Sequence, residues 1–230
     1  MRLDKFLSHN GFGSRKQVRY LLKEKLVTLN GEITQNHGYI LDLDKDEVCV
    51  NGEPITYVKD VYYMLNKPQG YISSTESDLY PSVLELIDSH RSDLIIVGRL
   101  DVDTEGLLLI TNDGKFSHNI SHGKKDIHKT YHVELKDAFD TDFVQQIEEG
   151  LFLEGKRIKP ASVKLIEPHT IELSIAEGKY HQVKRMMHAC DNEVLYLKRI
   201  RIGTLNLDAY LKLGDYRNLS KVEIEKLLTQ

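Results

Sequence analysis

Residues 98–106, GRLDVDTEG, place two carboxylates, Asp101 and Asp103, between glycines and directly before the apolar run LLLIT. An apolar run of this kind is typical of a buried strand, so the two acids belong to the turn that precedes it. Asp often caps backbone groups in turns, which accounts for one of them. The other is a candidate for chemistry, and the residues alone do not decide which acid that is.

A second group of chemically active side chains lies in KYHQVKRMMHAC, residues 179–190, which we predict to be helical. Its apolar residues recur at helical spacing and form a core stripe. The same spacing on another face aligns four cationic or titratable groups, which suit an anion or a solvated surface equally well: His181, Lys184, Arg185 and His188. The histidines lack a third ligand at a sensible spacing, so a zinc site is not expected.

A third group is HGKKDIHKTYH, residues 122–132, in which Lys124, Lys125 and Lys129 are interleaved with histidines and Tyr131. Aromatic rings among cations suit base stacking beside phosphates. An exposed loop that enters a strand is an equally good interpretation.

The elements that must position these groups are mostly strands. Alternating or apolar runs predict strands in VYYMLNK, DLIIVG, GLLLIT, KTYHVEL, TIELSIA and EVLYLKRIRI. Few helices separate them, which favours a mixed, largely antiparallel sheet with peripheral helices. We therefore predict an α+β protein.

The first sixty residues differ in character. A short amphipathic helix is followed by SRKQ, a capping box that starts a second helix. On that helix Arg15, Lys16, Arg19 and Lys23 fall within an arc of about 100°. Two Asn-Gly pairs, at 30–31 and 51–52, predict tight hairpins. The basic face is either a solvated surface or a contact for phosphates.

Composition limits the class of protein. The chain has 230 residues, a net charge of −4 and a pI near 6.2, which argues against coating nucleic acid by bulk charge but permits a local basic patch. No segment is apolar enough for a membrane span or a signal peptide. Cys49 and Cys190 are too few for a disulfide framework, so we expect a cytoplasmic protein with no membrane contact and no metal.

Two resemblances to known families cover almost the whole chain. RLDKFLSHNGFGSRKQVRYLLKEKLVTLNGE resembles the S4 RNA-binding domain, and LNKPQGY, GRLDVDTEGLLLITNDG, KTYHVEL and EGKYHQVKRMM, in that order, resemble the ribosomal RNA pseudouridine synthases. The resemblance implies an S4-like domain at 1–58 and a catalytic domain at 59–230. The chain carries no basic tail, and in this respect it is most similar to the branch of the family that acts on 16S rRNA of the small subunit.

The resemblance also implies roles for individual residues. Asp101 is the nucleophile, Lys184 is the basic residue that pairs with it, and Tyr131 acts on the base. Asp103 is then mainly structural. The reaction is a cofactor-free isomerisation of one uridine to pseudouridine on a flipped base, by a monomeric enzyme that binds rRNA. The expected substrate-binding and RNA-binding residues are Arg99, Thr104, Gly106, Lys67, Lys129, Arg185, Arg15, Lys16, Arg19 and Lys23.

Three rival interpretations remain at this point. The same chemistry on 23S rRNA shares every motif. A non-catalytic S4-type assembly factor needs the basic helix but not the catalytic set. A glycosylase also uses a carboxylate but releases free uracil. One departure from the family pattern is Cys190-Asp191-Asn192, where relatives have a glycine, and it leaves the end of the preceding helix uncertain.

Overall fold

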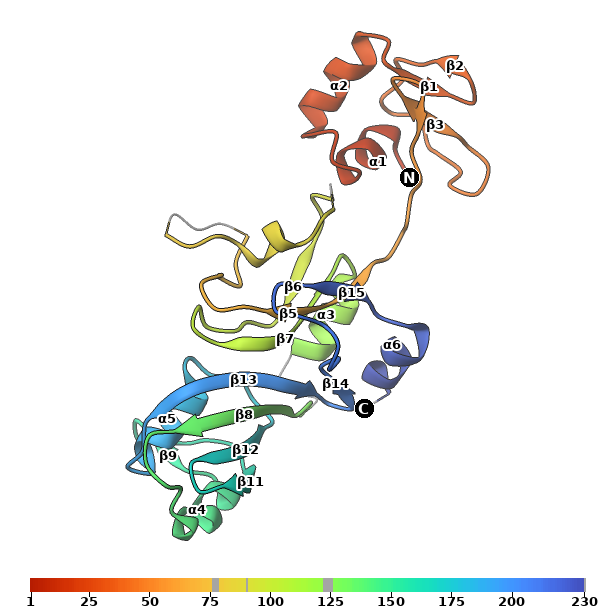
Figure 1. Ribbon diagram of the computed structural model, residues 1–230. Coiled ribbons are helices and arrows are strands. Elements are labelled where there is room, and N and C mark those ends of the chain that lie inside the picture. Colours follow the sequence, from red (N-terminus) through yellow and green to blue (C-terminus); the bar gives the residue numbers. More distant parts are fainter. Residues whose placement is uncertain (76–78, 90, 122–125, 230) are drawn as a thin grey trace. The chain divides into compact units, whose positions relative to one another are not determined.

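The computed structural model describes residues 1–75, 79–89, 91–121 and 126–229. The chain divides into two compact units, Met1–Asp60 with Asp88–Leu94, and Val61–Ile87 with Ile95–Gln230 (Figure 1). The division into domains at 1–58 and 59–230 stays a prediction. None of the helices in the described ranges is long and apolar enough to cross a membrane.

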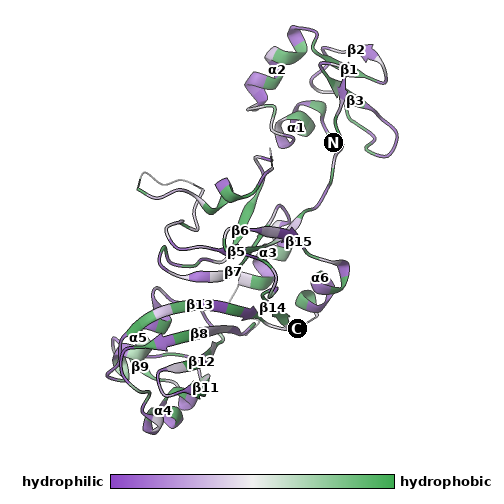
Figure 2. Cartoon of the chain, in the orientation of Figure 1, coloured by the Kyte–Doolittle hydropathy of each residue, from purple (hydrophilic) through white to green (hydrophobic). Residues whose placement is uncertain are grey.

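The first unit packs two helices against a small antiparallel sheet. Its elements are α1 Leu3–His9, α2 Arg15–Lys23, β1 Val27–Leu29, β2 Glu32–Ile33, β3 Val48–Val50 and β4 Glu53–Pro54, with strand order β2-β1-β3-β4. Leu3, Leu7, Val18 and Leu22 bring the apolar stripes of both helices into one core with the sheet. Figure 2 shows hydrophilic and hydrophobic residues alternating along α2, as expected for a helix with one buried face.

Local signals in this unit are confirmed. Ser14 and Gln17 form the capping box that begins α2. Asn30 and Gly31 both have positive φ, 52° and 84°, between β1 and β2, and the pair at 51–52 repeats this between β3 and β4. Two successive residues with positive φ are what a tight hairpin turn requires.

The second unit is built on a nine-stranded sheet. Its path runs β11-β12-β8-β13-β7-β5-β15, while β14 pairs with β13 and β6 pairs with β7. The strands are β5 Tyr62–Lys67, β6 Ile95–Val97, β7 Glu105–Thr111, β8 Lys129–Leu135, β11 Ala161–Glu167, β12 Thr170–Ile175, β13 Val194–Ile202, β14 Leu205–Asn206 and β15 Tyr216–Asn218. Among these the β13–β7 pair is parallel and the other pairings are antiparallel, so the predicted mixed sheet is confirmed.

Helices cover this sheet from several sides. Helix α3 packs on β6 and β7, α6 packs on α3 and β14, and α5 packs on β13 and β9 (Figure 1). The remaining elements are α3 Gly114–Ser121, α4 Val144–Glu149, α5 Gln182–Ala189, α6 Lys221–Leu228, the 3-10 turns Val83–Leu86 and Thr141–Phe143, and the small hairpin β9 Phe152–Leu153 with β10 Lys156–Arg157. The main core joins Met64, Leu107 and Leu109 of the sheet to Phe116 of α3 and Leu227 of α6.

Helix α5 ends with a normal C-terminal cap although it lacks the glycine of the family pattern. Asp191 takes the left-handed conformation, with φ 54°, just after the helix. The backbone N–H of Asn192 then returns to the carbonyl of Met187 at 2.9 Å and closes the last turn. Asp tolerates this conformation better than most residues with a side chain, so the helix ends as it would with glycine.

Candidate active site

The loop from Gly98 to Thr104 joins β6 to β7 and carries both aspartates. The side chain of Lys67, at the end of β5, is fully buried beneath it. Lys67 Nζ donates hydrogen bonds to the backbone oxygens of Pro68, Asp101, Val102 and Thr104 at distances between 2.8 and 3.3 Å. Burial lowers the pKa of Lys67 to about 8. A buried ammonium therefore fixes the path of the loop.

Lys67 was expected to form or support the RNA-binding surface. Its side chain is buried and its ammonium is engaged by four backbone oxygens, so in this structure it holds the loop and does not itself offer a contact for a phosphate. The segment after β5 adds further anchors to the same loop. Ser73 Oγ donates to the oxygen of Leu100 and accepts from its N–H, at 3.0 and 3.1 Å, and Gly70 N–H donates to the oxygen of Val102.

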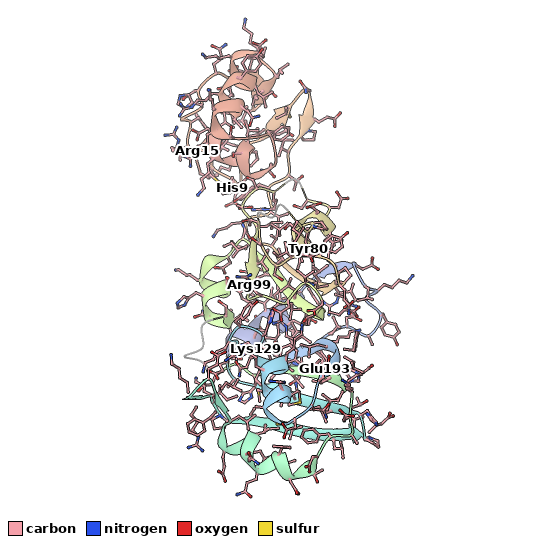
Figure 3. All side chains as sticks on the ribbon, turned by 90° about the vertical axis from the view of Figure 1, so that its left-hand side faces the viewer. His9, Arg15, Tyr80, Arg99, Lys129 and Glu193 are labelled. Atoms are coloured by element: carbon pink, nitrogen blue, oxygen red, sulfur yellow. The ribbon has the colours of Figure 1, made fainter. Side chains whose placement is uncertain are left out.

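Asp101 lies on a pocket of about 510 Å³ in the second unit. Tyr131, on β8, lines the same pocket and is 7% exposed, so its ring forms part of the wall. Arg99 and Lys129, both labelled in Figure 3, also line it, from the loop and from β8. The structure thus brings together Asp101, Tyr131 and three of the predicted binding residues, Arg99, Thr104 and Lys129, around one cavity.

Lys184 also lines the pocket, but its predicted partner was wrong. Its Nζ binds both carboxylate oxygens of Asp103, at 2.6 and 2.7 Å, and not Asp101. Partial burial opposes ionisation of Asp103, but the hydrogen bonds from Lys184 outweigh it, and the pKa of that carboxyl is lowered. The reason is local: His181 occupies the position next to Asp101, while the carboxylate of Asp103 is 65% exposed and open to Lys184.

His181 was not singled out as a neighbour of Asp101, and its position depends on backbone geometry. It precedes α5 in a left-handed conformation, with φ 47°, which L-residues adopt rarely. Its Nε2 lies 3.6 Å from Asp101 Oδ1, and its ring stacks on Tyr180 with centroids 3.9 Å apart. The available signal in the sequence was a histidine directly before QVK, the segment that carries Lys184.

The remaining predicted residues lie in different settings. Thr104 lines the pocket with a buried side chain, and Gly106 is buried at the start of β7, so neither offers a surface to the RNA backbone. Arg185 forms an ion pair with Glu154 at 2.9 Å. Arg15, Lys16, Arg19 and Lys23 are all exposed on α2, in the first unit. Lys124 and Lys125 lie outside the described residues.

Gly106 is required by a close approach of two strands. Its φ is +103°, and a Cβ at this position lies 2.2 Å from the backbone oxygen of Arg199. This is the point where β7 and β13 pair in parallel, Glu105 with Lys198 and Gly106 with Arg199. A side chain here would separate the strands, so the glycine lets Arg199 reach the pocket floor.

The charge of the pocket is mainly positive. Burial and the nearby charge of Arg199 lower the pKa of Lys129 to about 8. The charged residues along the wall are the cations Arg99, Lys129, Lys179, Lys184 and Arg199, with His181, and the acids Asp101 and Glu177. Such a wall suits a negatively charged polymer that presents one group to a carboxylate. Among the described residues, no group of three or more His, Cys, Asp or Glu side chains is arranged to hold a metal ion.

Comparison with known proteins shows the family to which the chain belongs. The family model described as RNA pseudouridylate synthase matches residues 61–189, which include the loop, β8 and α5. The chain belongs to the RNA pseudouridylate synthase family. Residues 1–48 match the S4 domain model, which covers the unit with the basic helix.

Full-length relatives agree with this assignment. A Bacillus subtilis protein described as an uncharacterized RNA pseudouridine synthase is 42% identical over 99% of this chain and 98% of its own. The ribosomal small subunit pseudouridine synthase A of Escherichia coli K12 is 40% identical over 99% of this chain and 100% of its own. A crystal structure of a pseudouridylate synthase, 39% identical, superposes with a TM-score of 0.71 and covers 99% of both chains.

Proposed function

We propose that this protein converts one uridine of 16S rRNA, in the small ribosomal subunit, into pseudouridine, without a cofactor and in the cytoplasm. The observation that carries the proposal is Asp101 on the wall of a cationic pocket that Tyr131 also lines. Relatives named ribosomal small subunit pseudouridine synthase A, including those of Pasteurella multocida and Escherichia coli, support the choice of the small subunit.

The chemistry must break one bond to C1′ of the ribose and form another. The bond from N1 to C1′ breaks, the uracil turns in the pocket, and C5 bonds to C1′. The proton on C5 then leaves to solvent and N1 takes up a proton, so that the product is an isomer of the substrate. The carboxylate of Asp101 either attacks C1′ or assists cleavage to a glycal-like intermediate, and both routes require it to be ionised. Tyr131 lies where it can stack on the base and act near C5.

Access to the pocket requires an unstacked base. A paired or stacked uridine cannot bring C1′ to Asp101, so the target nucleotide is flipped out of its helix. Positive side chains on the pocket wall and on α2 then hold the surrounding RNA by its phosphates and shape. The protein acts as a monomer in this proposal, because one pocket carries all the proposed catalytic groups.

Tritium release from C5-labelled uridine tests this function. Purified protein is incubated with partly assembled 16S particles and, side by side, with 23S RNA. We expect about one tritium released per 16S molecule and none from 23S. Release from 23S alone would keep the chemistry and overturn the choice of subunit. Binding without release, with correctly folded RNA, would favour an S4-type assembly factor, and free uracil in the supernatant would indicate a glycosylase.

A further inference from the structure

Two buried polar side chains on the pocket wall have atoms without a hydrogen-bond partner in the described part of the chain. Arg199 is 4% exposed and its Nη2 has no acceptor, and Thr104 is 1% exposed and its Oγ1 has no partner. Buried polar groups are nearly always paired, and leaving one unpaired costs about 1–3 kcal/mol. Two such atoms on one cavity point to a ligand that pairs with them.

The position of Arg199 is fixed by the centre of the sheet. Its Nε donates to the oxygen of Leu107 at 2.7 Å, which holds the guanidinium against β7. On the other side β13 pairs with β8, and Arg199 lies opposite Tyr131. Leu197 and Ile202 of β13 line the pocket as well. Arg199 therefore lines the pocket from β13, between the strand of Gly106 and the strand of Tyr131, and we call this part of the wall the floor.

The chemistry of this floor favours neutral oxygen acceptors on a base over a phosphate. Among the described residues no carboxylate pairs with Arg199, so its charge is free to polarise a carbonyl. A phosphate stays attached to the RNA strand at the mouth, whereas a flipped base enters deepest. Uracil has two carbonyl oxygens, O2 and O4, and an arginine N–H and a threonine hydroxyl both donate.

We propose that Arg199 Nη2 and Thr104 Oγ1 donate hydrogen bonds to the two carbonyl oxygens of the target uracil. This deepens the proposed function and rests on it. It makes Arg199 and Thr104 the residues that position the base and select uracil. Cytosine carries an amino group in place of O4, so it would set a donor against a buried donor, which sites of this type reject strongly.

The symmetry of the reaction explains why one pair of donors is sufficient. To bring C5 to C1′, the uracil turns by half a revolution about the axis through N3 and C6. That turn exchanges N1 with C5 and also O2 with O4. The donors that meet O2 and O4 before the turn therefore meet O4 and O2 after it. Arg199 and Thr104 can hold the ring in both its substrate and product orientations.

The test replaces the acceptor oxygens by sulfur, a weaker acceptor. 16S RNA is transcribed with uridine, 2-thiouridine or 4-thiouridine, and the modified nucleoside is quantified by chromatography after digestion. Loss of one hydrogen bond to a charged donor predicts that sulfur slows the wild-type protein roughly tenfold. Arg199→Met removes the guanidinium and Thr104→Val removes the hydroxyl. In each variant we expect the extra effect of sulfur to fall below about twofold for at least one of the two oxygen positions.

Arg201→Met is the matched control, since Arg201 lies on the same strand but binds Thr130 and does not line the pocket. It should keep the full sulfur effect at both positions. A merely structural role for Arg199 would lower the melting temperature but leave the ratio of sulfur to oxygen rates as in the wild type, and that result would overturn the inference.

Two further measurements keep the inference separate from the proposed function. The same RNAs are titrated into Asp101→Asn protein with and without Arg199→Met, so that affinity reports the coupling even if turnover is lost. Equal sulfur effects on both proteins contradict the role of Arg199. Failure of the wild-type protein to make pseudouridine in unmodified RNA contradicts the proposed function instead.

Discussion

Lys67 shows how one buried charge organises the catalytic loop. Four backbone oxygens share its ammonium, three of them from residues 101–104. Replacing it by an apolar side chain leaves these oxygens without their donor. Each buried acceptor left unpaired costs about 1–3 kcal/mol, so the loss exceeds that of any surface lysine.

We predict that Lys67→Met lowers the free energy of unfolding by about 3 kcal/mol and slows turnover more than tenfold, because the loop no longer holds Asp101 in place. Urea denaturation and tritium release measure the two effects. Lys115→Met, on the exposed side of α3, is the control and should change stability by less than about 0.5 kcal/mol. Equal effects of the two substitutions would show that the ammonium does not support the loop.

The sequence predicted which residue types gather at the site but not their pairing. Asp101, Tyr131 and Lys184 do line one pocket. The ion pair of Lys184 with Asp103 depends on the loop path that Lys67 imposes and on the left-handed backbone of His181, and neither is a local property of the motifs. Arg199 had no clear signal, because Lys198 and Arg201 lie on the same strand and only the structure shows which of the three cations is buried.

At the scale of elements, the parallel contact of β7 with β13 joins the two parts of the large sheet. The Asn-Gly hairpins could be predicted because positive φ is a local preference of those residues. The parallel contact could not, since its partners are more than 90 residues apart and the pattern of apolar residues does not state which strands meet.

We predict that Gly106→Ala destabilises the protein by at least about 2 kcal/mol, because its Cβ meets the backbone of Arg199 at 2.2 Å and its φ is +103°. Gly114→Ala is the control: it begins α3, and a Cβ there meets nothing within 4 Å. Its stability should be unchanged or slightly raised. Thermal unfolding compares them, and similar melting temperatures for both variants would contradict the close approach.

The attachment of α6 depends on an ion pair that acid removes. Arg217 binds Glu223, which also caps the helix through Ser220, and these hydrogen bonds lower the pKa of Glu223 from 4.5 to about 2. Between these two values the unfolded chain binds a proton that the folded chain does not. The contribution of Glu223 to stability is therefore complete above pH 4.5 and is lost as the pH falls to about 2.

Glu223→Gln retains a side chain that can form the capping box, so the comparison isolates the charge. We predict that the wild type exceeds this variant by roughly 2 kcal/mol at pH 6 and that the difference shrinks steadily below pH 4.5. Denaturation curves between pH 6 and pH 3 measure it. A difference in stability that does not depend on pH would show that the charge of Glu223 does not stabilise the fold.

At the scale of the whole molecule, an acidic protein must bind RNA through a local concentration of cations. The net charge is −4, yet Arg15, Lys16, Arg19 and Lys23 form one exposed face of α2. Phosphate contacts release counterions, so each contact adds about one unit to the slope of log affinity against log salt. The net charge argues only against binding RNA by bulk charge, and the arrangement of cations along α2 provides the local basic patch that it permits.

We predict that Arg15, Lys16 and Arg19 replaced together by glutamine weaken RNA binding and lower the salt slope by about two to three units. The rate at saturating RNA should be unchanged, because the catalytic groups lie in the other unit. The control replaces the exposed Lys115, Lys164 and Lys221 by glutamine, which changes the net charge equally. If both triple variants lose the same slope, the α2 face has no special role.

The measurement that tests the central claim most directly is tritium release by Asp101→Asn beside Asp103→Asn, on the same labelled 16S particles. We predict that Asp101→Asn releases no tritium above background and binds the particles as the wild type does. Asp103→Asn, which loses only the partner of Lys184, should retain measurable turnover. Substantial release by Asp101→Asn, or loss of turnover in Asp103→Asn alone, would contradict the proposal that Asp101 is the catalytic carboxylate.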